Sequence, residues 1–361
     1  MVLGRLSCFG LEMNKINRSL NMLHEKRKEE HLMLALREEV QFRDVTTGLE
    51  NFAFVHRALP EINLKDIDLS TRLFNKRLDA PLIISSMVGG IEAAVRINHN
   101  LARAAQSLGL AMVVGSQRCL IEKGGLAATF QVRDVAPDIL LFANLGAVQF
   151  NYGFGVAECH QIVRSIDADA LVLHLNPLQE ALQRAGNRDF SNLLEKIEIV
   201  CRELGVPVIV KEVGSGISEE VAGILARAGV SGIDVSGAGG TCWSEIERMR
   251  SGNRLAANVA RAFAGWGIPT AESVIMARRG APHLPIIASG GIRNGIDVAK
   301  AIALGADAAG IATPLLKAAM SSSEAVEQSL REMIEVLRIA MFCTGAADIP
   351  RLQYSPNLKK L

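Results

Sequence analysis

Short apolar runs alternate with helical stretches along most of the chain, and eight of these runs predict β-strands. Within each run nearly every position is apolar, a pattern typical of parallel strands that are buried on both faces. Eight such strands with intervening helices predict an α/β protein, a (β/α)₈ TIM barrel. The predicted strands are Pro81–Ser86, Leu110–Gly115, Ile139–Asn144, Ala170–Leu175, Pro207–Lys211, Gly232–Val235, Pro285–Ser289 and Ala308–Ile311.

The remaining segments predict additions to this barrel. We divide the chain into an N-terminal extension, residues 1–79, and one barrel domain, residues 80–361. The extension contains a charged helix at Leu23–Glu39 and an irregular arm at Phe52–Leu64. The other predicted additions are an insertion before the seventh strand, Arg248–Trp266, expected to cap the barrel mouth, and a C-terminal amphipathic helix, Ser323–Met341.

A glycine-rich loop, Gly290–Arg293, follows the seventh strand and precedes a helix at Asp297–Leu304. Glycine lacks a Cβ atom, so such a loop can bring backbone N–H groups close to an anion, and Arg293 adds a charged fork. A tight turn without a ligand is the alternative interpretation. A second segment of this type, Gly305–Asp307 leading into Ala308–Thr313, predicts that two adjacent strand ends converge on a phosphorylated cofactor.

The charges of the chain nearly cancel, because 39 Lys and Arg residues stand against 38 Asp and Glu residues. This balance provides no broad field for nucleic acid or an anionic membrane, and neither partner is predicted. Six cysteines lie scattered without a CxxC pair, which favours a reducing cytoplasm. No apolar run approaches the roughly 20 residues that span a bilayer, and Met1–Glu12 lacks a signal core. A cytoplasmic location is therefore predicted, with Met13 as an alternative start.

Polar side chains stand at the carboxyl end of nearly every predicted strand. In (β/α)₈ barrels the chemistry takes place at this end, so we expect an active site at one mouth. Routine loop polarity is the alternative, but it does not account for an excess of amides together with a lysine and a histidine. These positions include Ser86, Ser116, Arg118, Asn144, His174, Asn176, Lys211, Ser236 and Thr241.

Several longer motifs carry a resemblance to a known family. They include RKEEH at Arg27–His31, ISSMVGG at Ile84–Gly90, HLNPLQE at His174–Glu180, GAGGT at Gly237–Thr241 and SGGIRNG at Ser289–Gly295. In this order the chain resembles the type II isopentenyl-diphosphate delta-isomerases, which are flavin-dependent enzymes of isoprenoid synthesis. The resemblance runs from about Arg27 to Ile349, and HLNPLQE and RKEEH are its most specific parts.

The resemblance implies FMN at the barrel mouth. Amides and hydroxyls suit the pyrimidine edge of a flavin, and Lys211 can stabilise negative charge near N1 of the reduced ring. Without the resemblance, Lys211 would be a strand-end lysine that reaches solvent. The family usually has threonine where this chain has Val88, which removes one hydroxyl from the pocket. The implied FMN contacts are Ser86, Met87, Val88, Ser116, Asn144, Lys211, Ser236 and Thr241, with Gly290, Gly291, Ile292, Arg293, Ala312 and Thr313 at the phosphate.

The resemblance also implies a diphosphate substrate and Mg²⁺. Arg27 and Lys28 match the diphosphate-binding positions of the family, although such a pair is otherwise more often a solvated helix face. Glu180 matches the magnesium ligand, and one carboxylate suffices when diphosphate oxygens and water complete the octahedron. The further implied substrate contacts are Gln179, Asn176, Arg118, His31 and His174; a hydrogen-bonded strand-end histidine is the alternative for His174.

The implied reaction interconverts isopentenyl and dimethylallyl diphosphate by protonation and deprotonation, with no net oxidation. Reduced FMN would take part directly, with Gln179, Lys211 and His174 as the catalytic side chains. No strand is followed by GxGxxG and a downstream acid, so NAD(P)H would visit the flavin transiently as reductant. An arm that carries Arg27 and Lys28 is most useful docked on a body, which predicts an arm-swapped homo-oligomer, a tetramer or an octamer.

Three alternatives from other classes stay open at this point. An FMN-dependent 2-hydroxy-acid oxidoreductase needs a histidine base and an arginine after the sixth strand, where this chain has Ser236–Thr241. A nucleotide dehydrogenase would use Cys242 as its nucleophile, although a small residue packed at a loop-to-helix junction is the commoner explanation. A non-catalytic barrel that binds a phosphate ligand is the third.

Overall fold

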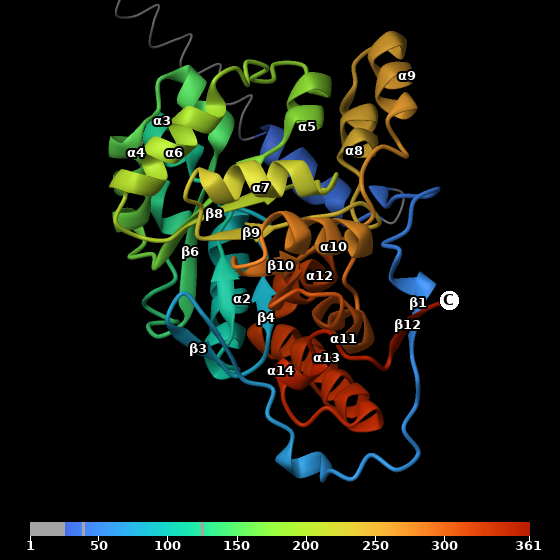
Figure 1. The fold of residues 1–361 in the computed structure, drawn as a ribbon. Coiled ribbons are helices and arrows are strands. Elements are labelled where there is room, and N and C mark those ends of the chain that lie inside the picture. Colours follow the sequence, from blue (N-terminus) through green and yellow to red (C-terminus); the bar gives the residue numbers. More distant parts are fainter. Residues whose placement is uncertain (1–25, 38–39, 124–125) are drawn as a thin grey trace, which may run out of the picture.

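The computed structural model describes residues 26–37, 40–123 and 126–361, and a closed parallel barrel forms its centre (Figure 1). The eight barrel strands follow one another in chain order, and the last pairs with the first. All eight predicted strands are present, and the predicted (β/α)₈ fold is confirmed. The strands are β4 (Leu82–Ile84), β5 (Ala111–Val113), β6 (Leu140–Gly146), β7 (Ala170–Leu175), β8 (Val208–Glu212), β9 (Gly232–Asp234), β10 (Ile286–Ala288) and β11 (Ala308–Ile311).

Helices surround the barrel because its strands are apolar on both faces. Two of these helices, α11 and α13, pack closely, since a Cβ atom on Gly295 would fall 2.3 Å from the carbonyl oxygen of Met333. The larger helices are α2 (Ala93–Ser107), α4 (Val156–Ser165), α6 (Leu193–Glu203), α7 (Glu219–Arg227), α10 (Thr270–Gly280), α11 (Gly295–Ala303), α12 (Thr313–Ser321) and α13 (Ser323–Thr344). Shorter ones are α3 (Arg118–Lys123), α5 (Pro177–Leu182) and α14 (Ile349–Leu352).

The interior of the barrel is packed with side chains, and a hairpin closes its amino-terminal end. Strands β2 (Thr71–Leu73) and β3 (Lys76–Leu78) are joined by Phe74 and Asn75, both with positive φ, as in a type I′ turn. The ring of Phe74 lies edge-on to Phe142 of β6, with 5.9 Å between the centroids. A Cβ atom on Gly232 would lie 3.0 Å from this ring, so the glycine leaves space for the hairpin that closes this end. The opposite, carboxyl-terminal end of the barrel is therefore the open one.

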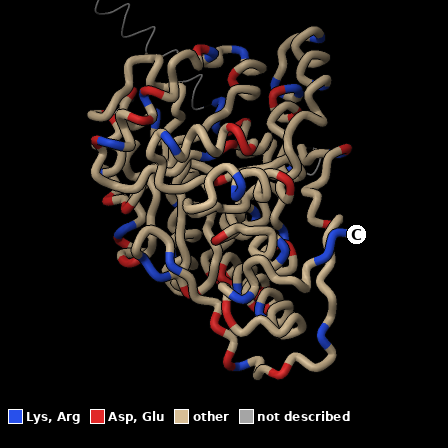
Figure 2. The backbone as a smooth tube through the Cα atoms, in the orientation of Figure 1, with Lys and Arg blue, Asp and Glu red and all other residues tan. Residues whose placement is uncertain are grey.

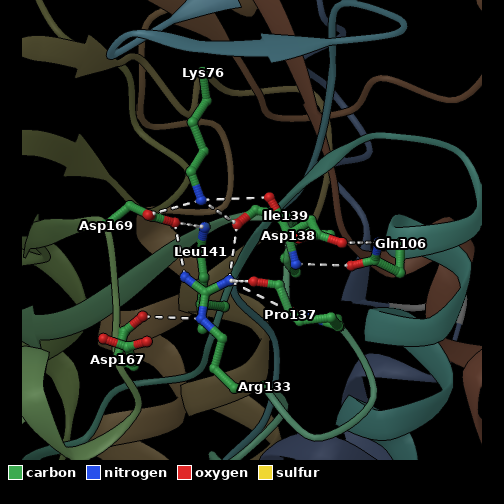
Figure 3. A network of polar contacts seen from close by, with 10 residues as sticks. Lys76, Gln106, Arg133, Pro137, Asp138, Ile139, Leu141, Asp167 and Asp169 are labelled. Carbon is green, nitrogen blue, oxygen red and sulfur yellow. Dashed lines mark hydrogen bonds and ion pairs between the residues drawn. The ribbon is translucent and has the colours of Figure 1, made fainter.

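A charged network fastens the hairpin to the amino ends of β6 and β7 (Figure 3). One oxygen of Asp169 lies 2.8 Å from Lys76 Nζ, and the other lies 2.8 Å from Arg133 Nη2 and accepts from the backbone N–H of Leu141 at 2.8 Å. Burial raises the pKa of Asp169, but the three donors outweigh it and hold the pKa below its usual range. The ionised carboxyl is thus the form that supports the fold.

The N-terminal arm differs from its prediction. Phe52–Leu64 was expected to be irregular, but β1 (Phe52–Phe54) pairs antiparallel with β12 (Leu358–Lys360) near the C-terminus (Figure 1). Its pairing partner lies at the other end of the sequence, so no local pattern could reveal it. Of the expected helix Leu23–Glu39, residues 26–35 are helical, while 23–25 and Met1–Glu12 lie outside the described residues.

The predicted convergence of two phosphate-type segments is half wrong. Gly305–Asp307 precedes β11 and lies at the amino-terminal end of the barrel, where Arg278 holds it by bonding Gly305 O and Asp307. The part of the segment that reaches the mouth is its other end, where Gly310, Ala312 and Thr313 line the cavity. The error arose because a glycine before a parallel strand and one after it lie a full strand length apart.

The insertion before the seventh strand forms a helical hairpin, α8 (Trp243–Arg250) and α9 (Arg254–Ala262), that extends beyond the mouth end of the barrel (Figure 1). Trp243 from its base lines the mouth. Within the described residues, no helix is long and apolar enough to cross a membrane.

We predict that Asp169→Asn lowers the free energy of unfolding at pH 7 by about 2 kcal/mol, because it leaves buried donors without a charged acceptor. The folded pKa of Asp169 is depressed, so its contribution is present above the usual range of an aspartate and is lost as the pH falls through the depressed value. Denaturant unfolding of both proteins between about pH 2 and pH 7 should show the difference shrink at acidic pH. An equal difference at every pH would contradict this role.

Candidate active site

A cavity of about 840 Å³ occupies the mouth of the barrel. The ends of the strands, the loops that follow them and the helix of residues 26–35 all line it. Every residue that the sequence placed in the site lies in this lining: Arg27, Lys28, His31, Ser86, Met87, Val88, Ser116, Arg118, Asn144, His174, Asn176, Gln179, Glu180, Lys211, Ser236, Thr241, Gly290, Gly291, Ile292, Arg293, Ala312 and Thr313. The fold thus brings them together, although the role of each stays a prediction.

Glycines form a cradle between the loops after β9 and β10. Gly290 and Gly291 have φ of 98° and 75°, values that favour glycine. A Cβ atom on Gly240 would fall 2.5 Å from the Gly291 nitrogen, and one on Gly291 would fall 2.7 Å from Gly239 O. Backbone therefore packs directly on backbone, and no other residue type fits.

The backbone donors of this cradle suit a phosphate. Within the described part of the chain, the N–H groups of Gly291 and Ile292 donate to no backbone carbonyl. Thr313 begins α12, whose first turn has no side-chain cap, and its hydroxyl lies 2.9 Å from that of Thr241. Free N–H groups at a helix start attract anions. Arg293 lies at the exposed rim, where its guanidinium donates to Gln41 Oε1 at 3.0 Å.

A polar layer crosses the barrel just below the cavity. His174, Lys211 and Asp234 are register neighbours on β7, β8 and β9. Lys211 Nζ lies 3.2 Å from Asp234 Oδ2 and donates to Ser289 Oγ at 3.1 Å. Ser289 in turn donates to Asp234 Oδ1 at 2.5 Å. Sequence reasoning missed Asp234, although an acid inside an otherwise apolar strand was a usable signal.

His174 is held as a neutral imidazole. Burial, and next the charge of Lys211, lower the pKa of His174 to about 4. Its Nδ1 lies 2.9 Å from Asn144 Oδ1, while the amide of Asn144 donates to Val114 O. Because the amide oxygen must accept, Nδ1 carries the proton and Nε2 keeps its lone pair. Asn144 does not end its strand as expected, because β6 continues to Gly146.

The helix of residues 26–35 brings cations over the cavity. Lys28 donates to the carbonyl oxygens of Gly89 at 2.6 Å and Ser116 at 3.3 Å. Arg27 is directed toward the same space, and burial and the charge of Arg118 lower its pKa. Two cations enclosed together favour an anionic ligand between them.

His31 joins this helix to α8. Its Nε2 lies 3.0 Å from Glu247 Oε1, and its ring packs edge-on to Trp243 at 5.2 Å. Burial lowers the pKa of His31, although the bond to Glu247 opposes the shift. Arg250 adds contacts to Glu247 at 2.7 Å and to Glu30 at 3.1 Å. Sequence reasoning missed Glu247 and Arg250, because no local pattern indicates that α8 contacts the helix of residues 26–35.

Helix α5, which follows β7, carries one buried carboxylate, that of Glu180. Asn176 Nδ2 donates to Gln179 Oε1 at 3.0 Å and to Glu180 Oε1 at 3.2 Å. The other oxygen of Glu180 accepts from the backbone N–H of Asn187 at 2.6 Å. Asn176 Oδ1 is buried and accepts no hydrogen bond from any described residue. The described residues contain no group of three or more His, Cys, Asp and Glu side chains that could hold a metal alone.

Glu212, at the carboxyl end of β8, is a further buried acid. Its carboxylate accepts from the backbone N–H groups of Val213, Gly214 and Ser215 at 2.6, 2.7 and 2.5 Å. Burial raises the pKa of Glu212 to about 7, against the effect of these donors. The bonds fix the loop after β8, in which Val213 and Gly214 line the cavity.

Comparisons with known proteins agree with this geometry. The sequence matches the family of FMN-dependent dehydrogenases over residues 24–124 and 157–358. The isopentenyl-diphosphate delta-isomerase of Nostoc sp. (strain PCC 7120 / SAG 25.82 / UTEX 2576) is 51% identical over 349 residues, 97% of this chain and 100% of that protein. The protein of the same name from Synechococcus sp. (strain ATCC 27144 / PCC 6301 / SAUG 1402/1) is 53% identical over 323 residues, 90% of this chain and 93% of that protein.

Solved structures share the fold. An active mutant of (S)-mandelate dehydrogenase superposes with a TM-score of 0.66 at 17% identity, covering 96% of this chain and 99% of that one. The flavin-binding domain of baker's yeast flavocytochrome b2 superposes with a TM-score of 0.64 at 18% identity, covering 90% and 79%. At these identities the likeness concerns the barrel alone.

We predict that Lys211→Met raises the pKa of His174, because it removes the charge that opposes protonation of the ring. Histidine NMR signals followed from pH 4 to pH 8 would measure the change, with Lys76→Met at the far end of the barrel as the matched control. An unchanged His174 titration in Lys211→Met would show that the two side chains are not electrostatically coupled.

Proposed function

This chain belongs to the family of FMN-dependent dehydrogenases and, within it, to the isopentenyl-diphosphate delta-isomerases, and we propose from this premise how its residues act. It is an FMN-dependent enzyme that interconverts isopentenyl and dimethylallyl diphosphate. The observation that carries the activity is 51% identity over 97% of the chain to a protein of that name.

The mouth cavity fits FMN. Within the described residues, the N–H groups of Gly291 and Ile292 donate to no backbone carbonyl and so are available to a phosphate, and Thr313 at the start of α12 adds a hydroxyl. Ser85 Oγ lines the cavity and has no partner among the described residues, so it is available to a polar ring edge. We assign the phosphate to Gly290–Arg293 with Ala312 and Thr313. The ring is assigned to Ser86, Met87, Val88, Ser116, Asn144, Lys211, Ser236 and Thr241.

The helix of residues 26–35 and helix α5, which follows β7, bind the diphosphate in this proposal. Arg27 and Lys28 supply positive charge from the helix of residues 26–35. Arg118 and His31 line the same cavity. Glu180 supplies one oxygen to Mg²⁺, and the diphosphate and water supply the rest. Asn176 orients Glu180 and Gln179 through its amide, as the two hydrogen bonds indicate. The metal is thus bound together with the substrate, consistent with a single carboxylate.

The side chains around the substrate position it and exclude water. Bound, reduced FMN supplies the group that exchanges a proton with the hydrocarbon. Gln179 faces the same cavity and holds the substrate, while neutral His174 offers a lone pair without adding charge. Lys211 provides the positive charge that favours the reduced cofactor. Water exclusion protects the positive charge that develops on the substrate.

The alternatives lose support at named residues. A 2-hydroxy-acid oxidoreductase requires a histidine and an arginine after the sixth barrel strand, where Ser236–Thr241 contribute glycines to the cradle instead. Cys242 is buried, lies outside the lining of the mouth, and its sulfur contacts Ser244 Oγ at 3.0 Å. Such a cysteine packs a loop-to-helix junction rather than acting as a nucleophile.

Further proposals concern the surroundings of the enzyme. We propose NAD(P)H as a transient reductant, because the described residues form no separate nucleotide-binding domain. A homo-oligomer, either a tetramer or an octamer, stays a proposal. Within this chain, the helix of residues 26–35 lines the cavity of its own barrel. A reducing cytoplasm is supported by free thiols at all five cysteines that the structure describes.

The direct test is an absorbance titration of the purified protein with FMN, followed by turnover of isopentenyl diphosphate. We expect the flavin spectrum to shift on binding, and dimethylallyl diphosphate to form only after the flavin is reduced. A protein that binds FMN but converts no substrate under reducing conditions would overturn the assignment.

We predict that Glu180→Gln lowers kcat/KM by at least about 100-fold, because it removes the charged oxygen that anchors Mg²⁺ to the diphosphate. FMN affinity should stay unchanged. Glu158→Gln is the control, since Glu158 only caps α4 by accepting from the Gly155 N–H. Wild-type activity and magnesium dependence in Glu180→Gln would show that this residue does not hold the metal.

We predict that Arg27→Ala with Lys28→Ala raises KM for the diphosphate on the order of 100-fold with a smaller change in kcat. The two charges act on a part of the substrate that does not react, so they contribute mainly to binding. The matched control is Lys26→Ala, an exposed cation on the same helix. Loss of FMN in the double variant would instead mark the pair as structural.

A further inference from the structure

The buried pair of Lys211 and Asp234 poses an electrostatic problem at the floor of the cavity. Their side chains are 8% and 5% exposed and lie next to apolar residues of the barrel interior such as Ile209 and Ile287. An ammonium group in such a place is unfavourable unless a counter-charge and hydrogen bonds compensate for the lost water. Lys211 lines the cavity, whereas Asp234 does not. The acid can therefore act on a ligand only through the residues it bonds that line the cavity, which are Lys211, Ser236 and Ser289.

Among the described residues, the other groups around Lys211 form no ion pair with it. His174, its neighbour on β7, is neutral, and Ser289 offers a hydroxyl. Glu212 is next in sequence and points to the opposite face of the strand, where its carboxylate is bound to three backbone N–H groups. Among the described residues, Asp234 is thus the carboxylate paired with Lys211.

The hydrogen bonds fix the position of the ammonium group as well as its charge. Asp234 divides its oxygens, with Oδ2 toward Lys211 and Oδ1 toward the Ser289 hydroxyl and, at 3.3 Å, the backbone N–H of Ser236. Ser289 accepts from Lys211 and donates to Asp234, so the three side chains close a triangle. The N–H of Ser236 anchors this triangle to the loop that begins the glycine cradle. These hydrogen bonds hold the side chain of Lys211 in one arrangement.

We propose that Asp234 is a positioning residue that holds the ammonium group of Lys211 in place and directed into the cavity, and so favours the reduced state of the FMN bound there. The inference rests on the proposed function, since it assumes that FMN occupies the mouth. A competing role exists: Asp234 could simply offset the charge of Lys211 and so disfavour the reduced flavin. The two roles predict shifts of opposite sign.

The variant Asp234→Asn separates these roles because it keeps the shape of the side chain. Its amide oxygen can still accept from Ser289 and Ser236, but its NH₂ group would face the ammonium of Lys211, donor against donor. Without a counter-charge the ammonium group no longer holds its position in this layer. Less positive charge then faces the cofactor, and reduced FMN loses stabilisation relative to oxidised FMN.

The experiment is a spectroelectrochemical titration of the FMN-loaded enzyme as wild type, Asp234→Asn, Lys211→Met and the double variant. We expect Asp234→Asn to lower the ratio of affinities for reduced and oxidised FMN about tenfold, a shift of about 30 mV to more negative potential for a two-electron couple. Lys211→Met should shift it in the same direction, and the double variant no further than Lys211→Met. Asp169→Asn, an ion-paired aspartate at the far end of the barrel, should leave the potential unchanged.

An unchanged or more positive potential in Asp234→Asn would overturn the proposal, as would effects of the two substitutions that simply add. Wild-type protein that binds no FMN would overturn the proposed function instead, so the two failures are distinguishable.

Thermal unfolding provides a second test if Asp234→Asn does not fold or retain FMN. Lys211→Met leaves a buried carboxylate unpaired, so the double variant should have the higher Tm of the two. A double variant with a lower Tm than Lys211→Met would show that the residues do not act as a pair.

Discussion

The pairing of β11 with β4 closes the barrel, and the whole site depends on this closure. In its register Ile311 lies beside Ile84, so the residues that follow each strand meet at one mouth. A closed parallel barrel brings the carboxyl ends of all its strands to one mouth, whereas an open sheet would spread them along an edge. Closure explains how the backbone after the first strand comes to lie against the last, where the N–H of Ser85 donates to Ile311 O at 2.9 Å. The cavity is therefore lined both by residues that follow the first strand, such as Ser86, and by residues that follow the last, such as Thr313.

Much of this fold and site could be predicted from the sequence, because burial on both faces leaves a strong mark in parallel strands. The eight apolar runs and the glycines of Gly290–Arg293 report local requirements, and a single sequence carries them. The pairing of Phe52–Phe54 with Leu358–Lys360 depends on residues more than 300 positions away, and no local pattern encodes it. Asp234 was missed for a related reason, since its partner Lys211 is defined by the barrel register. The Gly305–Asp307 segment shows the converse error, a correct residue type at the wrong end of a strand.

Local charge, rather than net charge, governs the chemistry of the mouth. Lys, Arg, Asp and Glu are interspersed along the whole backbone (Figure 2), in line with a net charge of +1. Arg27, Lys28 and Lys211 face the cavity, whereas His174 between them is neutral and the carboxylates are bound to donors. The positive charge of the site is thus fixed in position, and it suits an anionic substrate and a cofactor that becomes anionic on reduction.

The central claim is that a barrel shared with oxidoreductases performs a reaction without net oxidation. The most direct measurement counts NADPH oxidised for each dimethylallyl diphosphate formed from isopentenyl diphosphate, under anaerobic conditions with catalytic amounts of NADPH. The account predicts many product molecules for each NADPH, since reduction prepares the flavin and is not repeated in each cycle. A ratio of about one NADPH per product, as in an oxidoreductase, or full activity with oxidised FMN would contradict it.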